Sequence, residues 1–428
     1  MKQPGFYFFL SVFLFIGGIR SGFPVDKVTP TNVFDYSLQI ALDLQKSYPQ
    51  AAEVFFLEGN VYNRASKYDR AIEAFKKGLA LKPQQPDIIQ LVAFLYNKTN
   101  QFEAAAEWYR KSLAIEPDAP KGNERLGQAL VQLKRMDEAR SAFEQEIQHN
   151  PQNPFSRIYL GERYFDVGRL KEAREQAETA AKLDPKLPEP YYLLSKINRK
   201  EGKTEAATKN LETFQDLKKK EQELISQEQT PRSDQEQALL TAAITHYEAG
   251  TVYYNHGNRN QAESHFLAAV SLDPKNEPAR LSLARIYQEA NQWPKAVSFY
   301  RELTVINPKE YRYPYQLGLI LATMKQFEEA QRNMETALQM SPAAVDVKRA
   351  LVRVLFMSQG DMRKAVELTE SVISVEPTAE DYDLLGHAYF TLGELDKSLA
   401  ALSKAIELDP DNSTYRQRYD KVNALRNK

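Results

Sequence analysis

The fold is decided by a stretch of 34 residues, 52–85, which reads AEVFFLEGNVYNRASKYDRAIEAFKKGLALKPQQ. The alanine in the middle of this stretch recurs every 34 residues, at Ala71, Ala105, Ala139, Ala173 and Ala207, and after a longer step at Ala262, Ala296 and Ala330. A fixed period of this length is typical of a stack of similar two-helix units rather than of a compact globule.

Proline marks the same period and closes each unit. It stands at positions 49, 83, 117, 151 and 185, then at 274, 308, 342, 377 and 410. Proline ends a helix because it lacks a backbone N–H and clashes with the preceding turn. Within the first unit, Phe55, Gly59 and Tyr62 follow one another at intervals of three to four residues, which places them on one face of a helix.

This pattern of large, small and aromatic residues resembles the tetratricopeptide repeat (TPR), and about ten units carry it. The resemblance implies an all-α fold, a right-handed superhelical solenoid of helix–turn–helix repeats arranged here in two lobes. It also implies that the first helix of each repeat lines an inner, concave wall, and that the protein works through this wall as a binding surface.

The chain divides into segments where the period changes. We predict an N-terminal half repeat at 32–51, a first lobe of five repeats at 52–217, a second lobe of five repeats at 243–410 and a polar capping helix at 411–428. Between the lobes, no proline interrupts the charged run around Lys218, and the Ser233–Glu236 capping box starts a new helix. Residues 218–242 are therefore predicted to form a charged helical hairpin, either as a rigid spacer or as a docking element.

The first residues bear on localisation. Lys2 precedes an apolar run from Phe6 to Ile19, and Arg20 follows it. A helix of this length rises about 21 Å, short of the roughly 30 Å hydrocarbon core of a membrane. We predict a signal peptide over residues 1–22 and a periplasmic or secreted protein; the alternative is an uncleaved anchor that tethers the protein to a membrane.

Composition argues against several kinds of chemistry. The 56 basic and 57 acidic residues nearly balance, which gives no reason to expect a nucleic-acid partner. The chain has no cysteine, which excludes disulfides, zinc–thiolate sites and iron–sulfur clusters. No nucleophile elbow, zincin or kinase motif occurs, so we expect neither an enzyme nor a cofactor or metal site.

The residues expected on the concave wall are rich in aromatic and arginine side chains, the types that dominate binding interfaces. The predicted partner-binding residues are Phe56, Asn60, Tyr192, Lys196, Arg199, Tyr247, Tyr254, Arg285, Tyr315, Arg349 and Arg353.

Some TPR proteins hold a partner's terminal carboxylate with five clamp residues. Asn60, Lys121 and Arg125 match three of these positions, whereas Phe56 and Leu91 replace a Lys and an Asn. The loss of a charge and an amide argues against such a clamp in this chain.

The sequence thus predicts a non-enzymatic, exported scaffold that binds a protein or an extended peptide in its concave groove. The alternative is a membrane-tethered assembly factor for an envelope, pilus or secretion complex. The sequence leaves the oligomeric state open.

Overall fold

The computed structural model describes residues 27–228 and 233–427, and these residues form helices and turns with no strand. The predicted signal peptide over 1–22 lies outside the described residues. The chain separates into two compact units, one ending at Asn258 and the other running from Arg259 to the C-terminus. We refer to them as the N-terminal unit and the C-terminal unit.

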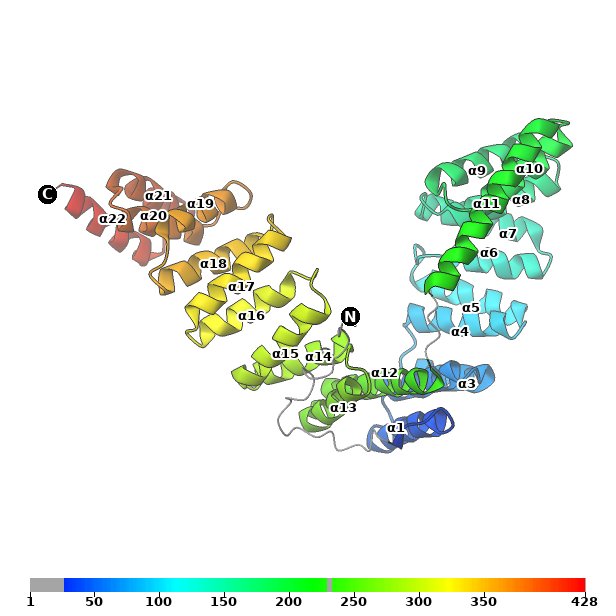
Figure 1. The fold of residues 1–428 in the computed structure, drawn as a ribbon, viewed down its shortest axis with the longest axis horizontal. Coiled ribbons are helices and arrows are strands. Elements are labelled where there is room, and N and C mark those ends of the chain that lie inside the picture. Colours follow the sequence, from blue (N-terminus) through cyan, green and yellow to red (C-terminus); the bar gives the residue numbers. More distant parts are fainter. Residues whose placement is uncertain (1–26, 229–232, 428) are drawn as a thin grey trace, which may run out of the picture. The chain divides into compact units, whose positions relative to one another are not determined.

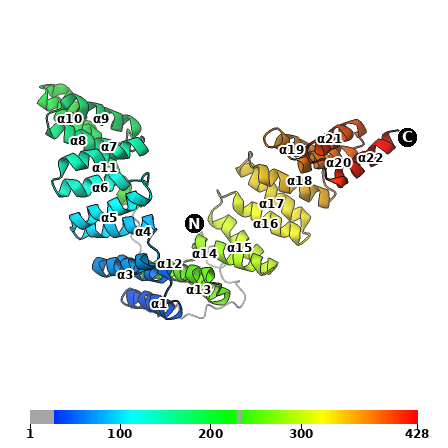
Figure 2. The ribbon, with the colours of Figure 1, turned by 180° about the vertical axis from the view of Figure 1, so that it is seen from behind.

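The described residues of the N-terminal unit form twelve helices, and successive helices from α2 to α11 pack as antiparallel pairs (Figure 1, Figure 2). The helices are α1 (Val33–Ser47), α2 (Ala52–Arg64), α3 (Tyr68–Leu81), α4 (Pro86–Lys98), α5 (Phe102–Ile115), α6 (Gly122–Gln132), α7 (Met136–His149), α8 (Pro154–Asp166), α9 (Leu170–Leu183), α10 (Glu189–Lys200), α11 (Thr204–Glu228) and α12 (Asp234–Asn255).

The C-terminal unit continues the same alternation of first and second helices. Its helices are α13 (Arg259–Leu272), α14 (Glu277–Glu289), α15 (Trp293–Ile306), α16 (Arg312–Thr323), α17 (Phe327–Met340), α18 (Val345–Met357), α19 (Met362–Ile373), α20 (Ala379–Thr391), α21 (Leu395–Leu408) and α22 (Ser413–Arg426). The predicted all-α repeat fold is confirmed. The predicted capping segment forms α22, which buries Tyr415 and Val422 and leaves most of its other side chains exposed or half-buried.

The recurrent small residues mark where the two helices of a repeat cross. The recurrent alanines, for example Ala71 and Ala139, have no exposed surface. A Cβ at Gly59 or Gly127 would lie 2.6 Å from the ring of Phe75 or Phe143 on the second helix. Close packing of this kind leaves no room for an added methyl group, so the spacing in the sequence follows from the crossing of the helices.

The helix of the predicted N-terminal half repeat, α1, packs against a helix that lies far away in the sequence. Instead of packing along α11 as a hairpin, α12 packs against α1 and α2. The Tyr36 hydroxyl lies 2.7 Å from Nε2 of the buried His246. Arg64 of α2 pairs with Glu248 at 2.9 Å. The N-terminal unit therefore includes α12 and ends at Asn258.

Neighbouring helices of the C-terminal unit are linked by tyrosine–glutamate hydrogen bonds. The hydroxyl of Tyr287 on α14 donates to Glu263 of α13 at 2.6 Å, and that of Tyr389 on α20 donates to Glu370 of α19 at 2.5 Å. Burial, together with the Glu263 carboxylate, raises the pKa of Tyr287, so the phenol stays protonated as a donor. These bonds fix how one repeat stacks on the next.

Within residues 27–228 and 233–427, no helix combines the length and the apolar composition needed to cross a bilayer.

Candidate functional site

Three of the predicted binding residues come together on α10 of the N-terminal unit. Tyr192, Lys196 and Arg199 lie on this first helix, next to Phe165 of the preceding first helix, α8. Lys196 Nζ is 4.7 Å from the ring centroid of Phe165 and 5.7 Å from that of Tyr192. Lys200 Nζ lies 5.0 Å from the Phe165 ring. We call these five residues the basic–aromatic cluster.

The basic–aromatic cluster is accessible and carries a surplus of positive charge. Tyr192 is 44% exposed, although one side of its ring meets Phe214 at a centroid distance of 5.1 Å. Arg199 is exposed, and its side chain has no hydrogen bond or ion pair with the described residues. Burial raises the pKa of the neighbouring Glu162, although the charges of Arg163 and Lys196 oppose this rise.

The predicted residues of the first repeat serve packing within the N-terminal unit. The Asn60 side chain donates to Glu248 of α12 at 2.9 Å. The ring of Phe56 covers Gly78 on α3 so closely that a Cβ there would lie 2.3 Å from it. Tyr247 and Tyr254 are half-buried on α12 itself.

The residues at carboxylate-clamp positions do not form a clamp. Arg125 donates to Gln90 at 3.2 Å, and Lys121 adopts a left-handed backbone conformation just before α6. Leu91 packs against the apolar cluster of the first two repeats. With Asn60 held by Glu248, these positions provide no convergent set of donors for a terminal carboxylate.

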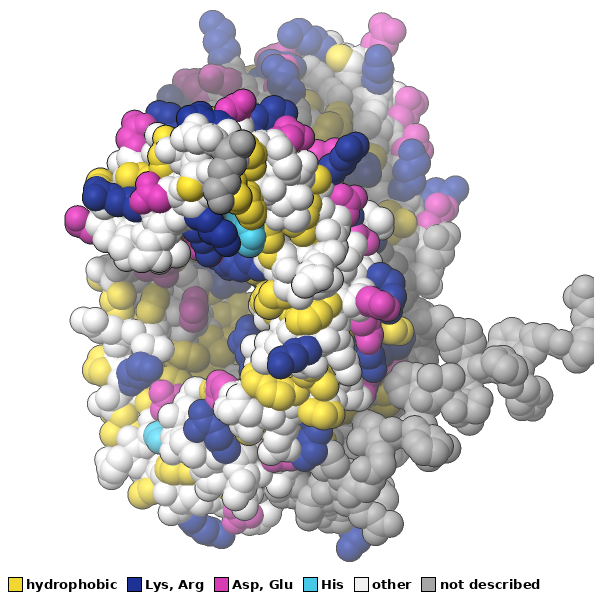
Figure 3. Space-filling view, turned by 90° about the vertical axis from the view of Figure 1, so that its left-hand side faces the viewer, with side chains coloured by type: hydrophobic (Ala, Val, Ile, Leu, Met, Phe, Trp, Pro, Cys, Tyr) yellow, Lys and Arg dark blue, Asp and Glu magenta, His cyan; other side chains and the backbone are white. Residues whose placement is uncertain are grey.

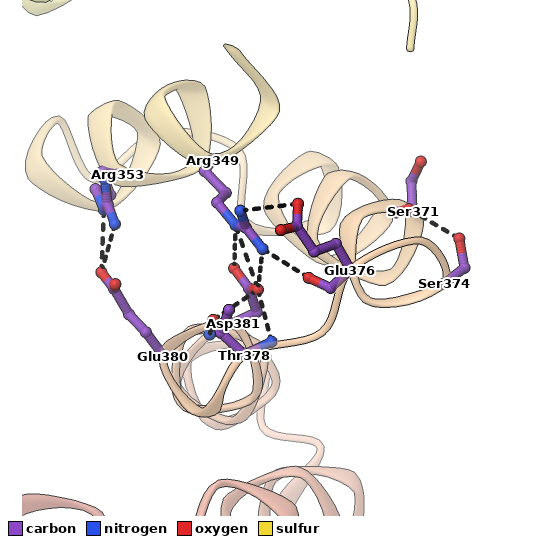
Figure 4. A network of polar contacts seen from close by, with 8 residues as sticks. All are labelled: Arg349, Arg353, Ser371, Ser374, Glu376, Thr378, Glu380 and Asp381. Carbon is purple, nitrogen blue, oxygen red and sulfur yellow. Dashed lines mark hydrogen bonds and ion pairs between the residues drawn. The ribbon is translucent and has the colours of Figure 1, made fainter. Parts of the chain in front are cut away.

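In the C-terminal unit, Arg349 and Arg353 of α18 reach toward α20 (Figure 4). Arg349 Nη2 is 2.9 Å from Asp381 Oδ2 and 2.6 Å from the Glu376 carbonyl oxygen. Asp381 also completes the capping box with Thr378. Arg353 pairs with Glu380 at 2.8 Å. Both guanidinium groups are thus engaged by the next repeat, and Arg349 is the more enclosed of the two.

The other two predicted residues lie on α14 and α16. Arg285 lines a cavity of about 590 Å³ bounded by α14, α15 and α16. Trp293, Tyr300, Arg312 and Tyr313 line the same cavity. The volume falls within the roughly 300–1,000 Å³ that is usual for ligand sites. Tyr315, also on α16, is half-buried, and burial raises the pKa of its phenol.

Sequence reasoning missed the aromatic wall of this cavity. Trp293 and Tyr300 belong to a second helix, and Tyr313 lies at a packing position of a first helix, so none of them follows the expected concave spacing. Trp293 begins α15 directly before Pro294 and is one of only two tryptophans in the chain. That rarity was the only signal in the sequence that could have found it.

A smaller cavity lies near the C-terminal end. It measures about 120 Å³ and is bounded by α20, α21 and α22, with His387 and Arg418 among its lining. Burial lowers the pKa of His387, and the nearby Arg418 lowers it further. Figure 3 views this end of the chain and shows basic side chains beside a histidine. The cavity is smaller than typical ligand sites.

Acidic and histidine side chains were also compared for metal binding. Within the part of the chain that the structure describes, no three of them come close enough together to hold a metal ion.

Comparison with known proteins supports the repeat assignment along most of the chain. Profiles of the tetratricopeptide repeat match residues 37–86, 63–123, 95–154, 130–197, 254–316, 311–343 and 384–412. The chain belongs to the tetratricopeptide repeat family. Its helices, small crossing residues and turn prolines are therefore those of TPR units, as the spacing predicted.

Individual relatives share only part of this TPR chain. The BBSome complex member BBS4 of Bos taurus is 25% identical over 167 residues, which cover 39% of this chain and 32% of that protein. Lipopolysaccharide assembly protein B of Haemophilus influenzae is 30% identical over 145 residues, covering 32% and 36%. The chain thus spans about a third of the length of these relatives.

The chain is also similar to parts of solved structures. YrrB, described as a TPR protein with an unusual peptide-binding site, is 18% identical, and the match covers 41% of this chain and 90% of that one with a TM-score of 0.38. Yeast Tom70 is 14% identical over 89% of this chain and 96% of its own, with a TM-score of 0.32.

Proposed function

We propose that this TPR protein is a non-enzymatic scaffold that binds a protein or an extended peptide along the first helices of its repeats. The observation that carries the proposal is the basic–aromatic cluster on α8 and α10. There, Tyr192 is 44% exposed and Arg199 is exposed with no partner among the described residues. Aromatic and arginine side chains in this state are the residues that contribute most to binding energy in interfaces.

The cluster is also preorganised. Lys196 Nζ lies over the rings of both Phe165 and Tyr192, and the Tyr192 ring also packs against Phe214. A side chain that is already ordered loses less conformational entropy when a partner binds. The cluster therefore offers a rigid surface on which a partner's peptide can lie, with cationic groups spaced along it.

We further propose that the protein acts outside the cytoplasm, as a periplasmic or secreted scaffold. The apolar run from Phe6 to Ile19 supports this proposal because its length suits a signal peptide. A second candidate is a membrane-tethered assembly factor. The similarity to lipopolysaccharide assembly protein B of Haemophilus influenzae favours it. N-terminal sequencing of the mature protein separates the two, since an intact Met1 in the membrane fraction supports the anchor.

The binding proposal can be tested with a display library of random short peptides selected against the full-length protein. Selected peptides are then titrated by fluorescence anisotropy against the wild type and against Lys196→Ala. We expect about a tenfold loss of affinity, equivalent to about 1.4 kcal/mol, because the ammonium group of the cluster is removed.

Lys111→Ala is the matched control. Lys111 also lies over an aromatic ring, at 4.8 Å from the centroid of Trp108, but it belongs to the second helix of its repeat, α5. Its substitution is expected to leave affinity within about twofold of the wild type, given the small worth of one exposed charge. Selected peptides that respond equally to both substitutions, or to neither, would contradict binding at the basic–aromatic cluster.

A further inference from the structure

The cavity between α14, α15 and α16 contains one guanidinium group whose charge is not compensated. Four charged residues line this cavity: Arg285, Glu289, Glu310 and Arg312. Glu289 is paired with Arg259 at 2.7 Å, and Glu310 with Arg312 at 3.4 Å. Arg285 is exposed and has no hydrogen bond or ion pair with the described residues. The lining thus holds two positive and two negative side chains, and Arg285 is the one of the four that forms no ion pair with the described residues.

Three aromatic side chains, Trp293, Tyr300 and Tyr313, form another part of the wall, beside Leu281, Gln288 and Gln316. Trp293 is half-buried, while Tyr300 and Tyr313 are only 2% and 7% exposed and are held in place by packing. The Tyr313 hydroxyl donates to Glu277, so its ring rather than its hydroxyl faces a ligand. A rigid aromatic surface beside a cation favours a ligand that combines an apolar group with a negative charge.

The geometry points to a specific ligand class: we propose that this cavity binds an acidic segment of a partner polypeptide, with a Glu or Asp side chain paired to Arg285 and a neighbouring apolar side chain packed on Trp293. This inference rests on the proposed peptide-binding function and names the chemistry of the partner. It concerns the C-terminal unit alone and is independent of the basic–aromatic cluster.

A carboxylate fits this cavity better than a phosphate does. Proteins that bind phosphorylated segments usually surround the phosphate with several arginines. Here the second guanidinium, that of Arg312, is already paired with Glu310. A single free guanidinium matches the single charge and the planar shape of a carboxylate.

The two tryptophans allow a direct test. In a full-length Trp108→Phe variant, Trp293 is the only tryptophan, so its emission reports on the cavity. The probe is a peptide of alternating Glu and Leu, acetylated and amidated so that only side chains carry charge. A Gln–Leu peptide of the same length is the neutral comparison. We expect a saturable change in Trp293 emission with the acidic peptide, and at least about tenfold weaker binding of the neutral one.

Two arginine substitutions then locate the interaction. Arg285→Gln is expected to weaken binding of the acidic peptide about tenfold, and Arg285→Lys less. Arg301→Gln is the matched control because it removes the same charge from α15, where Arg301 pairs with Glu329 at 2.6 Å outside the cavity lining. It should change affinity by less than about twofold. Circular dichroism of each variant verifies that the helices are retained.

The outcomes are distinct. Equal binding of the two peptides, no binding of either, or equal effects of the two arginine substitutions would overturn the inference. If the inference is overturned but the affinity of the library-selected peptides still depends on Lys196, the proposed function stands without it. If those peptides fail to depend on Lys196 while the acidic peptide depends on Arg285, the cavity is confirmed and the N-terminal cluster is not the binding site.

Discussion

The ion pair between the buried Arg280 and the partly exposed Glu302 allows a quantitative test of how the C-terminal unit is held together. Arg280 of α14 is 2% exposed, and its Nε donates to Glu302 of α15 at 2.9 Å. Its Nη1 also reaches the carbonyl oxygen of Asn276 at 3.4 Å. Substituting Glu302 with Ala leaves a guanidinium enclosed without its counter-charge. Breaking a buried pair in this way costs about 3–5 kcal/mol.

An exposed pair in the same unit supplies the comparison. The side chains of Arg353 and Glu380 are 51% and 53% exposed, so Glu380→Ala should cost less than about 1 kcal/mol. A double substitution of Arg280 by Met and Glu302 by Leu removes both buried charges, and it should recover most of the loss caused by Glu302→Ala alone.

The assay is urea unfolding of the full-length protein in the Trp108→Phe background. Trp293 begins the same helix that carries Glu302, so its fluorescence reports the unfolding of this region. The midpoint and slope give the free energy of unfolding for each variant. If Glu302→Ala lowers the free energy of unfolding no more than Glu380→Ala does, the enclosed guanidinium of Arg280 does not need Glu302 as its counter-charge, and the reasoning is wrong.

Three further expectations follow from other contacts. Burial lowers the pKa of His265 from 6.5 to about 4, so between these pH values the unfolded chain binds a proton that the folded protein does not. The free energy of unfolding should therefore fall by up to about 3 kcal/mol as the pH drops from about 6.5 to 4. Urea titrations should find this loss reduced in His265→Leu. Gly127→Ala places a Cβ 2.6 Å from the Phe143 ring and should cost about 1–3 kcal/mol in the same titrations; no change would show that the ring moves aside freely. Glu248→Gln weakens the pair with Arg64 and should speed amide exchange in α12, whereas unchanged exchange would mean that apolar packing alone holds this helix.

The repeat architecture could be predicted because it depends on the spacing of residues that are close together in the sequence. The constraints act within one repeat or between neighbouring repeats. Examples are the proline that ends each unit, the turn glycine Gly168 and the small residue Ala139. Each is dictated by backbone conformation or by the close crossing of two helices. Such constraints repeat with the period of the chain, so a single sequence reveals them.

The partner of the half repeat could not be predicted in this way. Tyr36 and His246 lie 210 positions apart, and neither departs from an ordinary TPR position. The packing of α12 on α1 depends on how all the helices between them are arranged, and the local period of the sequence does not predict that arrangement. The contact of α1 with α12 is a feature that the prediction of a half repeat at 32–51 did not include.

The candidate site shows the same limit at the level of single side chains. Position within the repeat predicts that Arg349 and Arg285 both lie on the exposed side of a first helix. Arg349 instead meets Asp381 because the following repeat begins with a capping box whose carboxylate faces back toward α18. Arg285 has no such counterpart and remains available. Whether an arginine on a first helix is available to a partner depends on whether the next repeat places a carboxylate beside it.

The docking of α12 is specified by directional polar contacts as well as by apolar burial. α1 buries Ile40, Ala41 and Leu44, an apolar stripe that many helices could cover. The hydrogen bonds of Tyr36 with His246 and of Ser37 with Thr245 (3.2 Å) fit one register only. A shift of one turn would leave these buried groups without partners, at a cost of about 1–3 kcal/mol each. The apolar stripe therefore supplies the attraction, while the polar pairs select α12 and its register.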